Sequence, residues 1–255
     1  MKAVILAGGK GTRLAPYTKV LPKPLMPIGE DMPILEILLR QLKRYGIDEV
    51  ILAVGYSAGL LRAFFQDGKR LGLKITYSFE DQPLGTAGPL SLLNNLDETF
   101  LVTNGDVLTT LSFSDLIDCH RRSHAIATIA SSVKKVRLDL GVIHTNVSDE
   151  VIGYSEKPTY DFLVSMGIYV FEPRVLTYIE HRQHLDFPDL VLRLIAAGER
   201  VLSHPYDGYW MDLGRVDDYE QAVMDFERLK PQLLGEQDGG ILSLPELVPH
   251  VAVPA

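Results

Sequence analysis

The sequence lacks the features that several classes of protein require. Its 255 residues include one cysteine, Cys119, so no intrachain disulfide can form and nothing demands an oxidising compartment. No uninterrupted apolar run approaches the ~20 residues of a membrane helix, and the N-terminus does not resemble a secretory signal. The formal net charge of -8 disfavours DNA or another polyanion as a partner. We therefore expect a soluble, cytoplasmic protein without a membrane or nucleic-acid partner.

Two further patterns are missing. The seven histidines have no recognisable metal-site or catalytic-triad spacing. No hexapeptide repeat follows Pro231, where the chain becomes rich in glycine and proline. The hydrophobic content of 46% is nevertheless ample for a large core. We predict one large domain over residues 1–230 and a short tail over residues 231–255.

A concentrated motif stands at the N-terminus. The apolar run from Ala3 to Ala7 suits a strand buried on both faces of a parallel sheet. The glycines and cations that follow it are Gly8, Gly9, Lys10, Gly11, Arg13, Lys19 and Lys23. Glycines let backbone N–H groups approach an anion, and an arginine fork suits phosphate oxygens. The spacing is neither that of a Walker loop nor, with Leu14 in place of glycine or alanine, that of a dinucleotide fingerprint. We predict a phosphate site rather than an ordinary tight turn.

The rest of the chain alternates between strand-like and helix-like segments. Buried strands are expected at Val50–Val54, Lys74–Phe79 and Thr99–Thr103, with a core-facing helix after Pro33 that Gly46 ends. Strands separated by helices imply a parallel sheet. The predicted fold class is α/β, with a Rossmann-like, mostly parallel sheet and helices on both faces.

The rhythm changes after about Lys134. Short strands at 141–144, 151–154 and 164–171 predict a small antiparallel extension that lies over the end of the sheet. A helix follows at 186–198, with Asp186 as its cap. A last helix is expected to bury a stripe formed by Val216, Tyr219, Val223 and Phe226.

Three loops carry candidate chemistry. The loop from Glu80 to Leu90 follows a strand, and Thr86 is expected to cap the helix that begins at Pro89. Asp106 follows the next strand, where a carboxylate can hold Mg2+ or cap a helix. Glu156, beside a lysine and a proline, reads on its own as a solvated turn.

The motifs GGKGTRL and LPKPLMP, at residues 8–14 and 21–27, together resemble the signature of the sugar-1-phosphate nucleotidylyltransferases. The resemblance covers roughly residues 2–227 and implies that residues 1–230 form the catalytic domain. It implies an enzyme that joins a nucleoside triphosphate to a sugar 1-phosphate with Mg2+ and releases pyrophosphate. Homodimers are common in this family and among proteins generally, so a homodimer is the first assembly to test.

The resemblance also implies roles for individual residues. The implied nucleotide-binding residues are Leu6, Ala7, Gly8, Gly9, Gly11, Thr12, Arg13, Gln82, Gly85, Thr86 and Gly105. The implied sugar-phosphate-binding residues are Gly141, Glu156, Lys157 and Gly167. The implied metal ligands are Asp106 and Asp212, and the implied catalytic residues are Arg13, Lys23, Asp106, Lys157 and Asp212.

The nucleotide and the sugar remain open. Residues 83–90, 21–24 and 210–212 look most like mannose-1-phosphate guanylyltransferases, which favours GTP, but Ser165-Met166-Gly167 departs from the asparagine-containing segment of mannose enzymes. The alternatives are a uridylyl- or thymidylyltransferase for glucose 1-phosphate, and a guanylyltransferase for a heptose or cyclitol 1-phosphate. A regulatory nucleotide-sugar-binding subunit would lack catalytic side chains that this chain has. A glycosyltransferase would carry an Asp-x-Asp motif, whereas Asn104 stands at its first position here.

Overall fold

A seven-stranded sheet forms the centre of the molecule. The structure, a computed structural model, describes residues 1–9, 11–29, 32–55 and 58–235. The sheet order is β12-β8-β11-β6-β1-β4-β5, and its strands are β1 Lys2–Leu6, β4 Glu49–Val54, β5 Lys74–Phe79, β6 Phe100–Asn104, β8 Ala127–Arg137, β11 Thr159–Phe171 and β12 Val201–Pro205. Only β11 runs antiparallel to its neighbours. The predicted mostly parallel sheet is confirmed.

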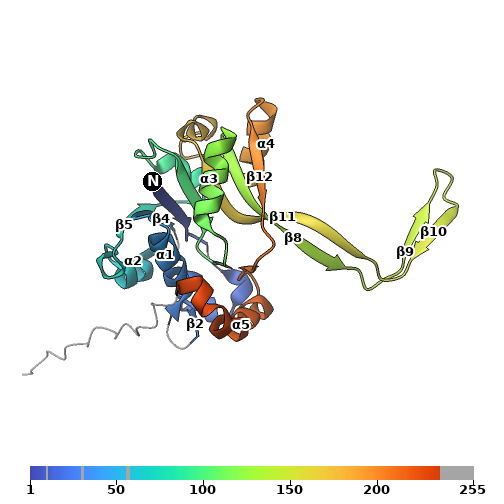
Figure 1. The fold of residues 1–255 in the computed structure, drawn as a ribbon, viewed down its shortest axis with the longest axis horizontal. Helices are drawn as coiled ribbons and strands as arrows, with labels where there is room; N and C mark the ends of the chain where they lie inside the picture. The colour runs from blue at the N-terminus through green and yellow to red at the C-terminus, as the bar shows by residue number, and fades with distance from the viewer. Residues whose placement is uncertain (10, 30–31, 56–57, 236–255) are drawn as a thin grey trace, which may run out of the picture.

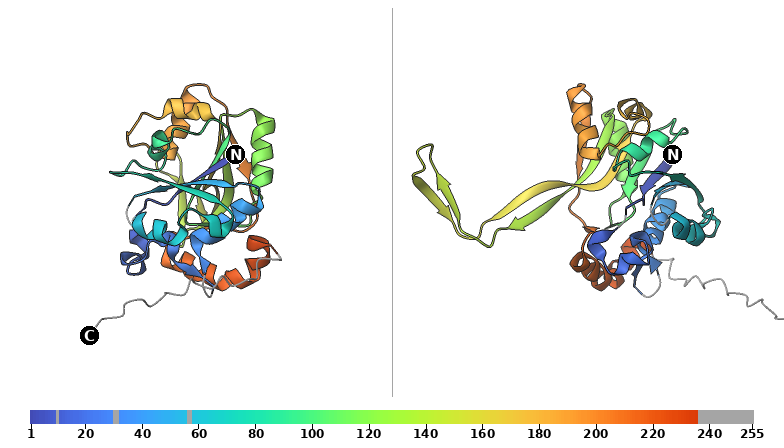
Figure 2. Two further views of the ribbon diagram at one scale, coloured as in Figure 1. Left: turned by 90° about the vertical axis from the view of Figure 1, so that its left-hand side faces the viewer. Right: turned by 180° about the vertical axis from the view of Figure 1, so that it is seen from behind.

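Helices cover both faces of this sheet (Figures 1 and 2). Successive side chains of β1 point to opposite faces, so Ala3 and Ile5 pack with α1 Ile34–Arg44, α2 Ala58–Phe65 and α3 Phe113–Ser123. Val4 packs on the other face, in the cluster that contains α4 Phe187–Ala196. Strand β1 is therefore buried on both sides, as its uninterrupted apolar run predicts.

The last helix, α5 Val216–Leu234, builds a separate apolar cluster. Its buried residues are Ala222, Phe226, Leu229, Leu233 and Leu234, whereas Val223 is exposed. The predicted stripe was therefore wrong at Val223, because the buried face follows the spacing from Ala222 to Leu233. The helix also continues through Pro231, so the folded body extends a few residues past the expected boundary at 230.

Short elements complete the body. Two-residue strands β2 Pro27–Ile28 and β3 Met32–Pro33 pair with each other, and β7 Val107–Thr109 pairs with β13 Trp210–Asp212. The 3-10 helices are η1 Thr12–Leu14, η2 Tyr17–Lys19, η3 Lys23–Leu25, η4 Lys69–Leu71, η5 Gly88–Leu92 and η6 Pro173–Tyr178. No helix in the part of the chain that the structure describes is both long and apolar enough to cross a membrane.

Strands β8 and β11 continue beyond the sheet as a two-stranded arm, which we define as residues 132–164 (Figure 1). Its tip is a hairpin of β9 Val142–Thr145 and β10 Val151–Ser155. Strand β12 pairs with β8 only as far as Ser131, and β6 pairs with β11 only from Ile168 onward. The arm therefore projects away from the body, as two opposite views show (Figures 1 and 2). The expected antiparallel strands are present, but they do not lie over the end of the sheet.

Candidate functional site

Two carboxylates meet near the carboxyl end of β6. Asp106 precedes β7, and β7 pairs antiparallel with β13 so that Val107 lies opposite Asp212. The backbone N–H of Leu213 donates a hydrogen bond of 3.1 Å to the carbonyl oxygen of Asp106. This pairing brings together two aspartates that are more than a hundred positions apart in the sequence.

Lys23 places a positive charge between these carboxylates. Its side chain is 8% exposed, and its Nζ donates to Asp106 Oδ2 and lies 3.8 Å from Asp212 Oδ1. Lys23 is the first residue of η3 and lies between Pro22 and Pro24. The two prolines restrain the backbone that carries it. A buried ammonium group needs such partners because burial of an unpaired charge is costly.

The carboxylates also affect each other. Burial, and next the negative charge of Asp106, raises the pKa of Asp212, while Lys23 and Arg13 oppose this shift. A Cβ atom on Gly214 would lie 3.4 Å from Arg13 Nη1 and 3.4 Å from Asp212 Oδ2, so the guanidinium group and this carboxylate flank the same glycine. The site therefore combines two cations with two carboxylates.

The glycine-rich loop lies beside this cluster. Gly105 donates from its backbone N–H to the carbonyl oxygen of Leu6, so the ends of β6 and β1 adjoin. Gly11 has φ +62°, and its carbonyl oxygen accepts a 2.7 Å hydrogen bond from the hydroxyl of the buried Thr18. Ala7 is buried, whereas Gly9 and Thr12 are exposed at the surface of the loop. Lys10 lies outside the described residues.

Sequence reasoning assigned no role to Glu80, although it borders the same loop. A Cβ atom on Gly8 would lie 2.4 Å from Glu80 Oε1, so any larger residue there would displace this carboxylate. Glu80 Oε2 also accepts a hydrogen bond of 3.0 Å from the backbone N–H of Leu84. The only signal in the sequence was the position of Glu80 directly after a strand.

The loop that contains Gln82 is fastened to the start of α4. Asp186 Oδ1 accepts hydrogen bonds from the backbone N–H and the hydroxyl of Thr86, at 2.9 and 3.1 Å. The Thr86 hydroxyl in turn accepts from the backbone N–H of Phe187, at 2.9 Å. The expected cap at Thr86 was therefore wrong, because its hydroxyl serves α4 rather than η5. Asp186 does stand at the N-cap of α4 as expected, but its side chain binds Thr86 rather than its own helix.

Gly85 is held closely in this arrangement, whereas Gln82 is exposed. Gly85 has φ +79°, and a Cβ atom on it would lie 2.6 Å from the carbonyl oxygen of Leu185. The packing against Leu185 by itself requires glycine here, independently of any contact with a nucleobase.

The four expected sugar-phosphate residues separate into two groups. Gly167, with φ +73°, lies beside Asn104 at the end of β6, so the structure brings it to the site. Gly141, Glu156 and Lys157 lie on the arm, and the last two are exposed. The structure does not bring these three residues to Asp106 and Asp212.

The donor set suits a hard divalent cation. No group of three or more His, Cys, Asp or Glu residues that could hold a metal occurs within the described ranges. Mg2+ needs no such group, because it commonly binds one or two carboxylates and substrate phosphates and keeps several waters. The oxygens of Asp106 and Asp212 fit that demand, and the Lys23 ammonium already lies between them as a cation.

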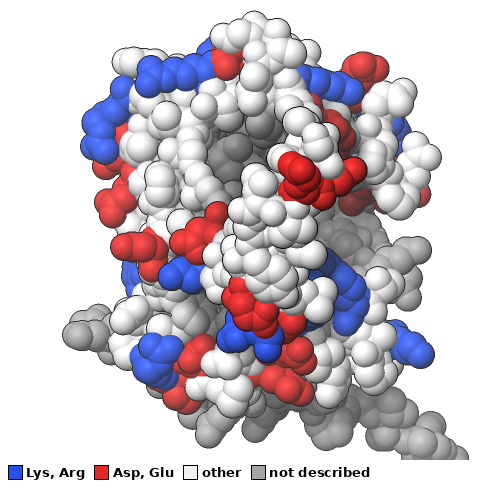
Figure 3. Space-filling view, turned by 90° about the vertical axis from the view of Figure 1, so that its right-hand side faces the viewer, with Lys and Arg blue, Asp and Glu red and all other residues white. Residues whose placement is uncertain are grey.

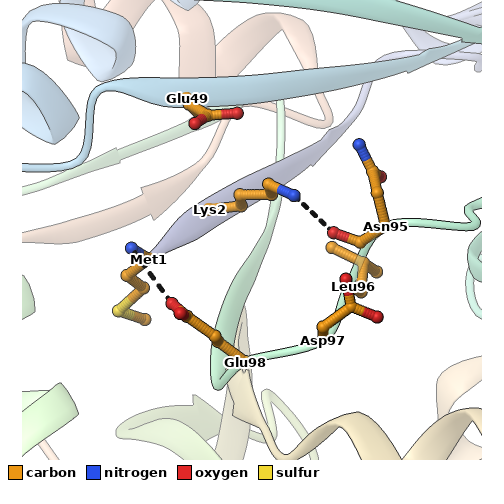
Figure 4. Close-up of a pocket in the computed structure, with 7 residues that line it drawn as sticks. All are labelled: Met1, Lys2, Glu49, Asn95, Leu96, Asp97 and Glu98. Atoms are coloured by element: carbon orange, nitrogen blue, oxygen red, sulfur yellow. Dashed lines mark hydrogen bonds and ion pairs between the residues drawn. The ribbon is translucent and has the colours of Figure 1, made fainter.

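A hollow of about 250 Å³ lies elsewhere, at the amino ends of the parallel strands (Figure 4). Lys2 and Glu49 line it, together with residues 95–98, and Lys2 Nζ donates to the carbonyl oxygen of Asn95. Open α/β sheets bind ligands at the carboxyl ends of their strands, at the point where the strand order reverses. That point lies between β1 and β6, so the cluster around Asp106, and not this hollow, is the candidate site.

Comparison with known proteins identifies the family of this chain. The model of a family described as Nucleotidyl transferase matches residues 2–228. The chain belongs to this family. It is 37% identical over 243 residues to a UTP–glucose-1-phosphate uridylyltransferase of Synechocystis sp., covering 88% of this chain and 62% of that protein. It is 34% identical over 233 residues to a mannose-1-phosphate guanylyltransferase of Mycobacterium tuberculosis, covering 89% of this chain and 64% of that protein. The resemblance inferred from the motifs is confirmed, and the chain spans less than two thirds of these relatives.

Solved structures share the fold. A putative glucose-1-phosphate thymidylyltransferase from Bacillus anthracis superposes with a TM-score of 0.72 at 24% identity, over 94% of this chain and 98% of that one. HddC from Yersinia pseudotuberculosis, in complex with GMP-PN, gives a TM-score of 0.67 at 23% identity, over 88% of this chain and 99% of that one. At these identities the likeness supports the Rossmann-like α/β fold alone.

Proposed function

We propose that this chain transfers a nucleotidyl group from a nucleoside triphosphate to a sugar 1-phosphate and releases pyrophosphate in a Mg2+-dependent reaction. The observation that supports this function is the cluster of Lys23, Asp106 and Asp212 beside a glycine-rich loop, at the reversal point of the sheet. Two relatives that carry out nucleotidyl transfer by name add to this support.

The chemistry fits a site without a dedicated base. The second pKa of a phosphate monoester is about 6, so the attacking sugar phosphate is mostly dianionic at neutral pH. The difficulty is to bring two anions together, which positioning and charge neutralisation overcome. Mg2+ held by Asp106 and Asp212 would supply part of that neutralisation.

Three cationic residues have separate tasks in this proposal. Arg13 and the amides of the glycine-rich loop bind the triphosphate. Lys23 neutralises charge on the reacting phosphates, and Lys157 holds the phosphate of the attacking sugar, with Glu156, Gly141 and Gly167 around the sugar. Residues Leu6, Ala7, Thr12, Gly105 and the loop with Gln82, Gly85 and Thr86 surround the nucleotide.

For the nucleotide we propose GTP, with mannose 1-phosphate as the sugar. The loop at residues 83–90 favours this pair, and a mannose-1-phosphate guanylyltransferase is among the relatives. The second candidate pair is UTP with glucose 1-phosphate, because the Synechocystis relative carries that name.

Pyrophosphate release tests the proposal. The purified chain is mixed with Mg2+, with each of GTP, UTP, dTTP, CTP and ATP, and with mannose 1-phosphate or glucose 1-phosphate. We expect release with one triphosphate far above the others, and no release from Asp106→Asn with any pair. Release that needs no sugar phosphate, or that Asp106→Asn retains, would contradict nucleotidyl transfer at this site.

A further inference from the structure

The arm carries an unusual share of exposed apolar surface. More than half of the exposed large hydrophobic residues among those described lie between Val133 and Leu163. Seen along the arm, uncharged side chains occupy much of the middle of this face (Figure 3). Contiguous apolar surface of this kind marks an interaction site.

One face of the arm carries an apolar stripe of Val136, Tyr160 and Phe162, which Lys134 interrupts. Residues opposite each other in an antiparallel pair point to the same side, and here Val136 pairs with Tyr160 and Lys134 with Phe162. The rings of Tyr160 and Phe162 lie 6.5 Å apart, and Phe162 is 51% exposed. Beyond Ser131 neither strand pairs with any other described strand of the sheet, so both outer edges are open. A two-stranded ribbon with open edges is marginal alone in water.

The arm also holds residues that the site of its own body lacks. Ser131 pairs with Ser165 at the root of the arm, and Arg137 pairs with Thr159 farther out along it. The segment from Ser131 to Arg137 spans about 20 Å at the rise of a β-strand, and Lys157 lies beyond it. A lysine side chain cannot cover that distance, so Lys157 is out of reach of Asp106 on the same chain in this conformation.

A hollow lies beside the root of the arm. Its volume is about 690 Å³, and Val133 and Leu163 of the arm line it together with Tyr206 and Trp210 of the body. Trp210 belongs to β13, the strand that ends at Asp212, and its Nε1 donates to the carbonyl oxygen of Met166. A segment from a second molecule that lies in this hollow would contact Trp210, which belongs to the same strand as Asp212.

We propose that two copies of this chain exchange arms, so that the arm of one copy supplies Glu156 and Lys157 to the Lys23–Asp106–Asp212 site of the other. In a dimer with two-fold symmetry each copy gives its arm to the other, so the assembly is closed and the apolar stripe on both arms is covered. The inference rests on the proposed function, since the need for Lys157 at the site comes from it. Each active site is then composite, with its nucleotide side on one copy and its sugar-phosphate side on the partner copy.

Mixing two inactive variants tests the exchange. Asp106→Asn inactivates the body and Lys157→Ala inactivates the arm, so an exchanged pair of one copy of each holds one intact site. After the two variants associate at random, we expect about a quarter of the wild-type activity, because half of the pairs are mixed and each has one working site of two. The matched control mixes Asp106→Asn with Asp212→Asn: both changes lie in the body, so no activity returns.

Sedimentation of the full-length chain tests the assembly without relying on activity. We expect a dimer for the wild type and a monomer for Phe162→Glu, which puts a charge in the stripe. Leu192→Glu is the matched control, because it makes the same kind of change at an exposed site on α4 and should leave the dimer intact. A monomeric wild type would overturn the proposal, as would an active wild type whose body and arm variants dimerise but regain nothing on mixing. A dimeric wild type that Phe162→Glu dissociates, but that is inactive with every substrate pair, would support the docking of the arms while contradicting the proposed function.

Discussion

Thr86 and Asp186 hold the loop that contains Gln82 to the start of α4, across a separation of 100 residues. The Thr86 hydroxyl donates to Asp186 and accepts from Phe187, so its hydrogen-bonding capacity is used inside the protein. The position of this loop therefore depends on two side chains rather than on the loop sequence alone.

Removal of this connection should weaken nucleotide binding. We expect Asp186→Ala or Thr86→Val to raise the KM for the triphosphate more than it lowers kcat, and to cost about 1 kcal/mol of unfolding free energy per lost hydrogen bond. Steady-state kinetics and urea unfolding measure these effects. Asp186→Asn keeps an acceptor oxygen and should restore most of the affinity; an unchanged KM in Asp186→Ala would contradict the role of this contact.

The carboxylate pair should be essential for turnover but not for folding. Asp106→Asn and Asp212→Asn remove charge from an open site, and we expect each to lower kcat/KM by more than about 100-fold, a loss typical of electrostatic catalytic groups. The fold should persist, although Asp106→Asn should lower the melting temperature because the buried Lys23 loses the carboxylate that its Nζ contacts. The control is Asp97→Asn, which removes the same charge at the opposite end of the sheet (Figure 4). Near-normal activity of either site variant would contradict the assignment.

Arg13 should act through its planar fork as well as its charge. We expect Arg13→Ala to lower kcat/KM on the order of 100-fold, and Arg13→Lys to recover only part of the loss because an ammonium group cannot form paired bonds to phosphate. Lys19→Ala removes an exposed positive charge six positions away and should have little effect. If Arg13→Lys equals the wild type, charge alone accounts for the role of Arg13.

A comparison of alanine variants at two glycines distinguishes the effect of backbone strain from the effect of a close contact at the site. Gly167 has φ +73°, and a Cβ atom on it would lie 2.5 Å from Asn104 Nδ2. Gly46 has φ +76°, but a Cβ atom on it would meet no neighbouring atom within 4 Å. Both alanine variants should lose about 1–2 kcal/mol of stability to the left-handed backbone. Only Gly167→Ala should also displace Asn104 and lower kcat/KM. Equal activity of the two variants would show that this close contact is not needed.

The buried His120 should make stability sensitive to acid. Burial lowers its pKa below the ordinary value of 6.5, and the hydrogen bond to Glu172 opposes that shift only in part. Below pH 6.5 the unfolded chain therefore binds a proton at His120 more readily than the folded chain does. The contribution of neutral His120 to the free energy of unfolding is present above that pH and is lost as the pH falls below it. His204 shifts in the same direction.

Urea unfolding at several pH values between 7.5 and 5 measures this loss. His120→Gln should reduce the dependence on pH, although it also costs stability by disturbing the bonds to Thr128 and Glu172. Exposed His184→Gln should leave the dependence unchanged. A His120→Gln variant with the full wild-type dependence would contradict this explanation.

Local patterns determined much of this protein from the sequence alone. The strand at Lys74–Phe79 and the helix from Ile34 were predicted because apolar periodicity reflects the side chains that a segment buries. Asp106 and Arg13 were found for a similar reason: a carboxylate or a glycine-rich turn directly after a strand lies at the ligand edge of a parallel sheet. Asp212 came from the resemblance, since nothing in its neighbourhood indicates a partner more than a hundred positions away.

The tertiary structure decided which segments that are distant in the sequence contact each other. It paired β7 with β13, which brings Asp212 to Asp106, and it placed Lys23 between them. It used Thr86 to fasten a helix other than the one expected, and it extended β8 and β11 into an arm that carries Lys157 away from the site of its own chain. Periodicity records which residues of one segment are buried, whereas the choice of partner depends on the free energy of packing the whole chain. The sequence therefore predicted the residues of the candidate site, and the fold decided which of them one molecule brings together.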